Sequence, residues 1–154
     1  MNIMQMENGI MNITQENKEL LFKDLSARLP YHVRVKVWLK DGTTEEGVLD
    51  LEHNYADVLR DAFYYNKIVD IKPYLRPMSS MTEEEISDLQ KINSQFCFDT
   101  FDNFAYVGAA DDGFCSIEEM SNILNYLNSH HFDYRGLIEK NLAIEDTKEN
   151  NSHK

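Results

Sequence analysis

The segment HHFDYRG, residues 130–136, gathers the side chains of this chain that are best suited to chemistry. His130, His131 and Asp133 all carry atoms that can bind a metal ion. Adjacent histidines point in different directions, however, and no Cys or Glu at ligand spacing completes a tetrahedral set. We therefore predict no metal here and expect these histidines to lie at a helix end.

The two cysteines, Cys97 and Cys115, are the candidate nucleophiles. A catalytic pair of either thiol with His131 remains an alternative, but neither cysteine lies in a strand-to-helix nucleophile turn. With no export signal in the sequence, we expect two reduced thiols in the cytosol, and a disulfide between them is the alternative.

Other catalytic patterns fail on residue type or spacing. The six glycines are scattered singly, so no glycine-rich phosphate loop exists. The run DDGFCSIEEM has the glycine and the final glutamate of a calcium loop, but Gly108 and Ala110 stand where side-chain oxygens are required. We expect no cofactor and no enzyme activity, with a small hydrolase or thiol enzyme kept as an alternative.

Charge is distributed unevenly along the chain. The net charge is −12; residues 1–76 hold 12 acidic and 10 basic side chains, whereas residues 77–154 hold 15 and 5. Duplex DNA requires neutralisation of its phosphates by Lys and Arg, so an acidic second half excludes it as a partner. The acidity favours solubility, and a basic partner surface or mimicry of a nucleic acid is the alternative.

No run of about 18 apolar residues occurs, which predicts that nothing spans a membrane. The first residues lack the basic and apolar regions of a signal peptide. We expect a cytoplasmic protein.

The first half has the periodicity of a helix followed by a small sheet. Leucines four residues apart predict an amphipathic helix over residues 14–29, with Asp24 among the charged residues that face water. Strict alternation over residues 33–40 predicts a half-buried strand, with Trp38 on its polar face. The pair Asp41-Gly42 is a hairpin signal.

Further strands are expected over residues 43–52 and 67–72. Residues 55–65 fit either a strand or a helix, and we favour a strand over 56–60. Pro73 and Pro77 fix φ and remove backbone donors, so we expect no regular element to run through residues 71–85 and Pro73 to end the β half.

The second half has mainly helical periods. Ser80 or Thr82 caps a helix that runs to about Asn93, and residues 96–114 suggest one or two short strands. Ser116 caps a second helix to about residue 129, followed by a short helix over 134–142 capped by Asp133. The expected apolar face of the second helix consists of Ile117, Met120, Ile123, Leu124 and Leu127.

These elements predict an α+β fold with an N-terminal helix, a small SH3-like antiparallel barrel or bent sheet, and a helical C-terminal half. We expect a flexible leader over residues 1–12, a first lobe over 13–76, a second lobe over 77–144 packed on the first, and a disordered tail over 145–154.

A helix followed by VxVxLKDGxxxxGxL resembles the first motif of the Sm-like barrels. In that family an Asn and the residue before it help to form a uracil-binding loop, which would place such a loop at His53 and Asn54. The second motif of the family, an Arg-Gly between apolar residues, is absent from residues 67–75. The matching residues are Val35, Val37, Leu39, Lys40, Asp41, Gly42, Gly47, Leu49, Asp50 and Asn54.

A second resemblance covers more of the chain, from about residue 16 to residue 145. The blocks ENKELLFKDLSARLPY, DIKPYLRPMSSMTEEE and LNSHHFDYRGLIEKNLAIE are similar to a family of small uncharacterised proteins of anaerobic gut bacteria and of their bacteriophages or other mobile elements. This resemblance implies a folded domain but no particular activity.

Taken together, these patterns predict a non-enzymatic interaction protein whose partner is another protein, with its oligomeric state left open. Exposed aromatic residues and Arg are enriched in interfaces. A single-stranded RNA-binding Sm-like module that uses His53 and Asn54 is the alternative. The candidate partner surface consists of Trp38, His130, His131, Asp133, Tyr134 and Arg135.

Overall fold

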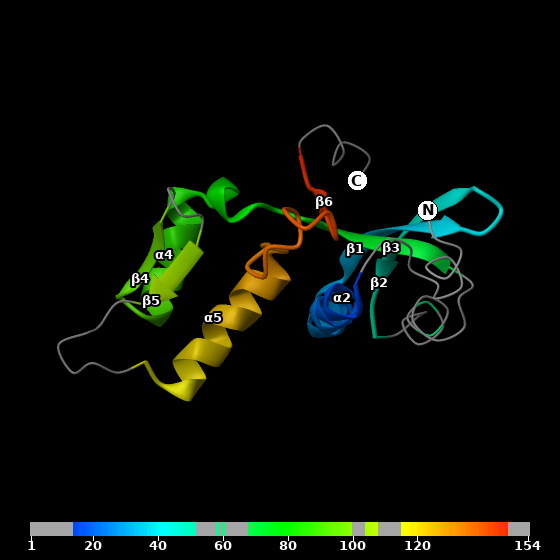
Figure 1. Ribbon diagram of the computed structural model, residues 1–154. Coiled ribbons are helices and arrows are strands. Elements are labelled where there is room, and N and C mark those ends of the chain that lie inside the picture. Colours follow the sequence, from blue (N-terminus) through cyan, green and yellow to red (C-terminus); the bar gives the residue numbers. More distant parts are fainter. Residues whose placement is uncertain are drawn as a thin grey trace. The chain divides into compact units, whose positions relative to one another are not determined.

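The computed structural model describes residues 14–51, 58, 60, 68–99, 104–107 and 115–147. Within these residues the chain is an α+β protein with three α-helices, a four-stranded sheet and a two-stranded sheet (Figure 1). The chain divides into two compact units. The first comprises Met1–Tyr74 and Leu137–Ile144, and the second comprises Leu75–Gly136 and Glu145–Lys154. The predicted α+β class is confirmed.

The first unit begins with α2 (Gln15–Arg28), whose N-terminus is capped because the Thr14 hydroxyl accepts a hydrogen bond from Asn17 N–H at 3.1 Å. Leu21 and Leu25 are fully buried, as the leucine spacing predicts. The prediction that Asp24 faces water is wrong. Its carboxylate is completely buried and accepts hydrogen bonds from the equally buried Arg28, at 2.9 and 3.1 Å, because the two residues lie one helical turn apart.

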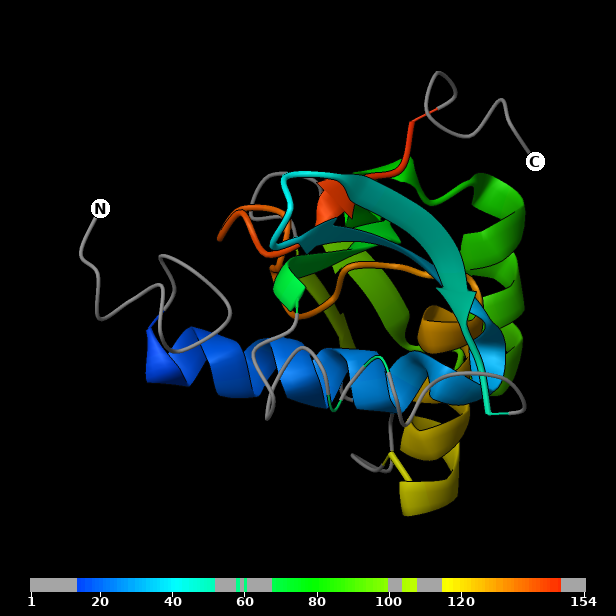
Figure 2. The same ribbon diagram turned by 90° about the vertical axis from the view of Figure 1, so that its right-hand side faces the viewer.

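After the short 3₁₀ helix η1 (Leu29–Tyr31), the chain enters a sheet that curves strongly beside α2 (Figure 2). The alternating strand β1 (Val33–Leu39) pairs antiparallel with β2 (Thr44–Leu49) and β3 (Ile68–Leu75). Gly42, at φ 88°, makes the turn between β1 and β2. The described strands of this sheet form an open sheet and no closed barrel. In spatial order they are β2 (Thr44–Leu49), β1 (Val33–Leu39), β3 (Ile68–Leu75) and β6 (Ile144–Glu145).

The prediction that Pro73 ends the β half is wrong. β3 continues through Pro73 to Leu75, and Pro73 lies opposite Val35 of β1. Among the described residues, the other edge of β3 is paired only with the two-residue strand β6. A proline is tolerated in a strand where its missing N–H is not needed for a ladder, and this sparsely paired edge provides such a place.

The second unit contains η2 (Met78–Ser80), α4 (Glu83–Ile92), the antiparallel pair β4 (Phe96–Asp99) and β5 (Phe104–Val107), and α5 (Ile117–Ser129). Of the two cap residues predicted for α4, Thr82 is the one that forms a capping box, with Glu85, and the predicted cap of α5 is confirmed as a box of Ser116 with Glu119. The buried core of this unit consists of Met78, Leu89, Phe96, Ile123, Leu127 and Phe132.

The predicted apolar face of α5 is only partly buried, because Ile117, Met120 and Leu124 are exposed. Another prediction for the C-terminal region is wrong. The short helix expected over residues 134–142 is a series of turns, in which Gly136 and Asn141 have positive φ values of 76° and 58°. Positive φ at two positions is incompatible with a continuous α-helix.

Several other expectations fall on residues outside the described part of the chain. They concern the leader over residues 1–12, the loop at His53 and Asn54, and most of residues 55–65. Val58 and Arg60 are described, and both are helical rather than extended. Of the described helices, none combines the length and the hydrophobicity that a membrane crossing requires.

Candidate functional site

The HHFDYRG segment is tied by its backbone to the start of the second unit. The chain leaves α5 at His130 and reverses at His131, which has a φ of 61°. Arg76 N–H donates to the His131 carbonyl and Asp133 N–H donates to the Arg76 carbonyl, each at 2.8 Å. Residues 76 and 132, far apart in the sequence, are thereby paired as an isolated parallel bridge.

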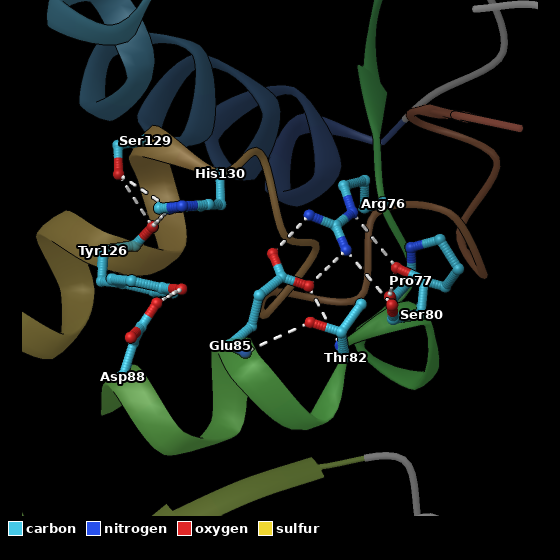
Figure 3. A network of polar contacts seen from close by, with 9 residues as sticks. All are labelled: Arg76, Pro77, Ser80, Thr82, Glu85, Asp88, Tyr126, Ser129 and His130. Carbon is cyan, nitrogen blue, oxygen red and sulfur yellow. Dashed lines mark hydrogen bonds and ion pairs between the residues drawn. The ribbon is translucent and has the colours of Figure 1, made fainter. Parts of the chain in front are cut away.

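The Arg76 side chain reinforces this junction (Figure 3). Its guanidinium donates two hydrogen bonds of 2.7 Å to the Glu85 carboxylate and a third of 3.1 Å to the Ser80 carbonyl. The same group lies 4.2 Å from the centre of the buried Phe132 ring. Hydrogen bonds from Arg76, aided by those of the Thr82 cap, lower the pKa of Glu85 to about 2.

His130 is held by contacts with the last turn of α5. Its ring stacks on Tyr126 with 4.0 Å between ring centres, and its Nδ1 lies 2.9 Å from the Tyr126 carbonyl oxygen and 3.2 Å from the Ser129 hydroxyl (Figure 3). The Tyr126 hydroxyl donates to Asp88 at 3.1 Å. Burial, together with this bond to Asp88, raises the pKa of Tyr126 to about 12.

These contacts show that the HHFDYRG segment organises its own unit. Asp133 is buried, whereas His130, His131, Tyr134 and Arg135 are half-buried. The Tyr134 hydroxyl donates to Asn128 at 2.9 Å, and the Arg135 guanidinium lies 4.6 Å from the Tyr134 ring centre. In the described part of the chain, no group of three His, Cys, Asp or Glu side chains is arranged to hold a metal ion.

Trp38 belongs to the first unit, whereas the HHFDYRG residues of the predicted partner surface belong to the second. The half-buried Trp38 ring lies on the polar face of β1, and the ammonium groups of Lys36 and Lys72 lie 5.4 and 5.7 Å from the ring centre. Lys72 comes from β3 and also donates to the Asn141 side chain at 3.1 Å. Two strands and a turn thus fix the surroundings of this indole.

The same face continues along β1 to Arg34. Its guanidinium lies 3.8 Å from the centre of the Tyr74 ring, and the Tyr74 hydroxyl donates to Glu46 of β2. Burial raises the pKa of Asp70, opposite Trp38 on β3, while the charge of Lys72 acts in the opposite direction. We define the Trp38 face as Arg34, Lys36, Trp38, Glu46, Asp70, Lys72 and Tyr74.

Sequence reasoning identified Trp38 but missed its neighbours on β3. The alternation over β1 already placed Arg34 and Lys36 on the same side as Trp38. The contribution of Lys72 depends on the register of β1 with β3, which pairs Lys36 with Lys72. Register is a tertiary property, and it cannot be predicted from the local sequence pattern of residues 67–75.

The cysteines have ordinary surroundings in the described residues. Cys97 and Cys115 are free thiols. Cys97 lies opposite Tyr106 in the β4–β5 pair. Electrostatic repulsion from the Cys97 side chain raises the pKa of the exposed Tyr106 hydroxyl. Cys115 directly precedes the cap of α5, with its sulfur 3.7 Å from the Ser116 carbonyl oxygen.

Comparison with known proteins adds no relative to this description. No protein-family model, curated protein or solved structure significantly matches the chain.

Proposed function

We propose that this chain is a non-enzymatic cytoplasmic interaction protein, encoded by a bacteriophage or another mobile element, that binds a partner protein through the Trp38 face. The observation that carries the proposal is the position of the only tryptophan of the chain. Trp38 is half-buried on a regular strand and is flanked by two lysines from adjacent strands.

A tryptophan in this setting has the properties of an interface anchor. A few large aromatic residues usually carry most of the binding energy of an interface. Here the ring is already oriented by Lys36 and Lys72, and cation–π contacts at exposed sites contribute about 0.5–1 kcal/mol each. Such preorganisation reduces the entropy that binding would otherwise cost.

The local charge indicates the chemistry of the partner. The Trp38 face holds three basic and two acidic side chains, although the chain as a whole is strongly acidic. Glu46 is engaged by the Tyr74 hydroxyl, and both lysines lie beside the indole. A partner segment with an apolar side chain for Trp38 and nearby carboxylates for the lysines would match this face.

The HHFDYRG segment fits this role less well. Its buried or half-buried side chains are engaged in contacts within the second unit, including those of His130 with Tyr126 and of Tyr134 with Asn128. Substitutions there would therefore disturb folding together with any binding.

Affinity purification of the tagged protein from its native cell tests the proposal. We expect Trp38→Ala to lose a protein that the wild type recovers. Tyr106→Ala is the matched control, since it also removes an aromatic side chain, 46% exposed, from a strand in the second unit. Recovery of the same proteins with Trp38→Ala as with the wild type would contradict the proposal.

A purified partner can then be titrated directly. Because the chain contains one tryptophan, the intrinsic indole fluorescence reports on the Trp38 face alone. A binding partner that leaves this fluorescence unchanged and binds Trp38→Ala with the same Kd would use another surface.

Single-stranded RNA is the second candidate ligand of this face. An aromatic ring flanked by lysines is a common arrangement for stacking a base next to neutralised phosphates. The predicted Sm-like loop at His53 and Asn54 lies outside the described residues. Titration with oligo-uridylate would show quenching of Trp38 and an affinity that falls with salt if RNA were the ligand. No quenching at low salt would exclude this candidate.

The proposal includes an SH3-like barrel for the first unit. It is supported by the order of α2, β1, the Asp41-Gly42 turn and β2, and by the curvature of the β1–β2 pair (Figure 2). A barrel requires that the free edge of β2 be paired with a further strand. Interstrand nuclear Overhauser effects from β2 to a residue outside β1 would support closure, and their absence would indicate a bent open sheet.

A further inference from the structure

One side of α5 presents an apolar stripe that the core of its own unit does not use. Ile117, Met120 and Leu124 are 91%, 40% and 37% exposed, whereas Ile123 and Leu127 on the same helix are each 3% exposed. Residues 117, 120 and 124 are spaced i, i+3 and i+7, which places them on one face of a helix. We call these three residues the α5 stripe.

The α5 stripe extends the buried face of the helix sideways. At 100° per residue, Met120 and Leu124 lie next to Leu127, whose side chain is in the core. Single exposed apolar residues are normal on protein surfaces, whereas neighbouring exposed apolar residues on one helix form a candidate interaction surface. Ile117 contributes nothing to the capping box that begins the helix, because that is made by Ser116 and Glu119.

Charge indicates what covers this stripe. α5 contains Glu118 and Glu119 and no Lys or Arg. The described residues of the second unit hold ten acidic and three basic side chains. Two of those three, Arg76 and Lys91, already form ion pairs within the unit, at 2.7 and 3.6 Å. The described part of the second unit, which carries the stripe, therefore has an excess of negative charge.

We propose that the α5 stripe, which belongs to the second unit, binds a basic amphipathic helix of a partner protein. The apolar side of such a helix would cover Ile117, Met120 and Leu124, and its flanking Lys and Arg residues would face the acidic second unit. Helix-on-helix recognition with apolar anchors at i, i+3 or i+4, and i+7 is a common mode of peptide binding.

A second copy of the chain is the less favourable occupant. Each copy has a net charge of −12, most of it in residues 77–154. Packed helices lie about 8–10 Å apart, close to the Debye length of about 8 Å at physiological salt. Pairing two acidic units through α5 would therefore place like charges within the range of their repulsion.

The test uses a fluorescently labelled helical peptide of Leu and Lys, with Leu at the i, i+3, i+4 and i+7 positions. A peptide in which Glu replaces every Lys is the charge control. Ile117→Gln combined with Leu124→Gln removes two thirds of the stripe, and Gln preserves helix propensity. Asn122→Gln combined with Asn125→Gln is the matched variant, because both positions are exposed on α5 outside the stripe.

We expect the Leu/Lys peptide to bind the full chain and the matched variant equally, and the stripe variant at least about tenfold more weakly, since an apolar anchor is lost. We expect the Leu/Glu peptide not to bind. Equal binding by the stripe variant, or no binding by the wild type, would overturn the proposal. So would sedimentation showing a dimer that the stripe variant abolishes, because a second copy would then cover the stripe.

Discussion

The ion pair between Arg76 and Glu85 permits a quantitative prediction. Replacing Glu85 by Gln removes the charge that accepts both 2.7 Å hydrogen bonds, yet keeps the size of the side chain. Glutamine can also serve in the capping box with Thr82, so α4 retains its N-terminal cap. The substitution therefore removes the charge and one of the two hydrogen bonds from Arg76, because the amide nitrogen of glutamine cannot accept a bond.

The magnitude follows from the pKa of Glu85, which lies at about 2 in the folded chain against an ordinary value of 4.5. Such a difference corresponds to at most about 3 kcal/mol at neutral pH. The Arg76 and Glu85 side chains are 26% and 13% exposed, so solvent screens part of this energy. We expect Glu85→Gln to lower the free energy of unfolding of the second unit by about 1–2 kcal/mol.

The effect must also depend on pH in a defined direction. Because the folded pKa lies below the unfolded one, the stabilisation is complete above pH 4.5 and declines as the pH falls towards 2. The difference in stability between the wild type and Glu85→Gln should therefore shrink over that interval. Urea denaturation followed by far-UV circular dichroism measures it, since urea, unlike guanidinium chloride, does not screen charges.

Glu84→Gln is the control for this prediction. Glu84 is exposed in the same first turn of α4, so its substitution removes the same charge from the same end of the helix dipole. We expect a change within about 0.5 kcal/mol. If the two variants lose equal stability at neutral pH, or if the loss in Glu85→Gln is independent of pH, the ion pair does not stabilise this junction as described.

Three further perturbations test other parts of the structure. Leu75→Ala should cost about 2–5 kcal/mol in urea denaturation because Leu75 is fully buried, and an unchanged stability would show that it lies in no core. Asp24→Ala should cost about 3–5 kcal/mol by leaving the charge of Arg28 buried without its carboxylate, whereas a loss under about 1 kcal/mol would show that this pair is solvated. Spectrophotometric titration should show a tyrosine that ionises near pH 12 and that is absent in Tyr126→Phe. Stability should fall from pH 10 to 12, because over that interval the hydroxyl of Tyr126 ionises in the unfolded chain but stays protonated in the folded one; an unchanged titration in the variant would contradict the raised pKa.

Local chemistry in the sequence predicted the elements well. The caps at Thr14, Thr82 and Ser116 form as expected because each requires only a side-chain oxygen and the N–H of a residue three positions later. The β1–β2 hairpin follows from alternation and from Gly42, whose positive φ costs a glycine little. These features depend on neighbours in the chain, so they can be read before any tertiary structure is known.

Two of the three misplacements depend on partners distant in the sequence, and the third depends on a partner one helical turn away. Pro73 remains in a strand because β1 pairs with one edge of β3, while the described pairing of the other edge is limited to the short strand β6. Periodicity identified the apolar face of α5 but could not show that the core uses only part of it. Asp24 was placed in water because charged residues usually are, although Arg28 one turn later permits its burial.

For the candidate site, the sequence by itself determined that Trp38 lies on the polar side of a strand, because side-chain alternation is a property of the strand alone. Only the tertiary structure decided that Lys72 joins it, since the register between β1 and β3 is set by packing. The same reason explains the HHFDYRG segment. Its residue types suggested a binding surface, but the bridge from Arg76 to residue 132 makes it part of the framework of the second unit.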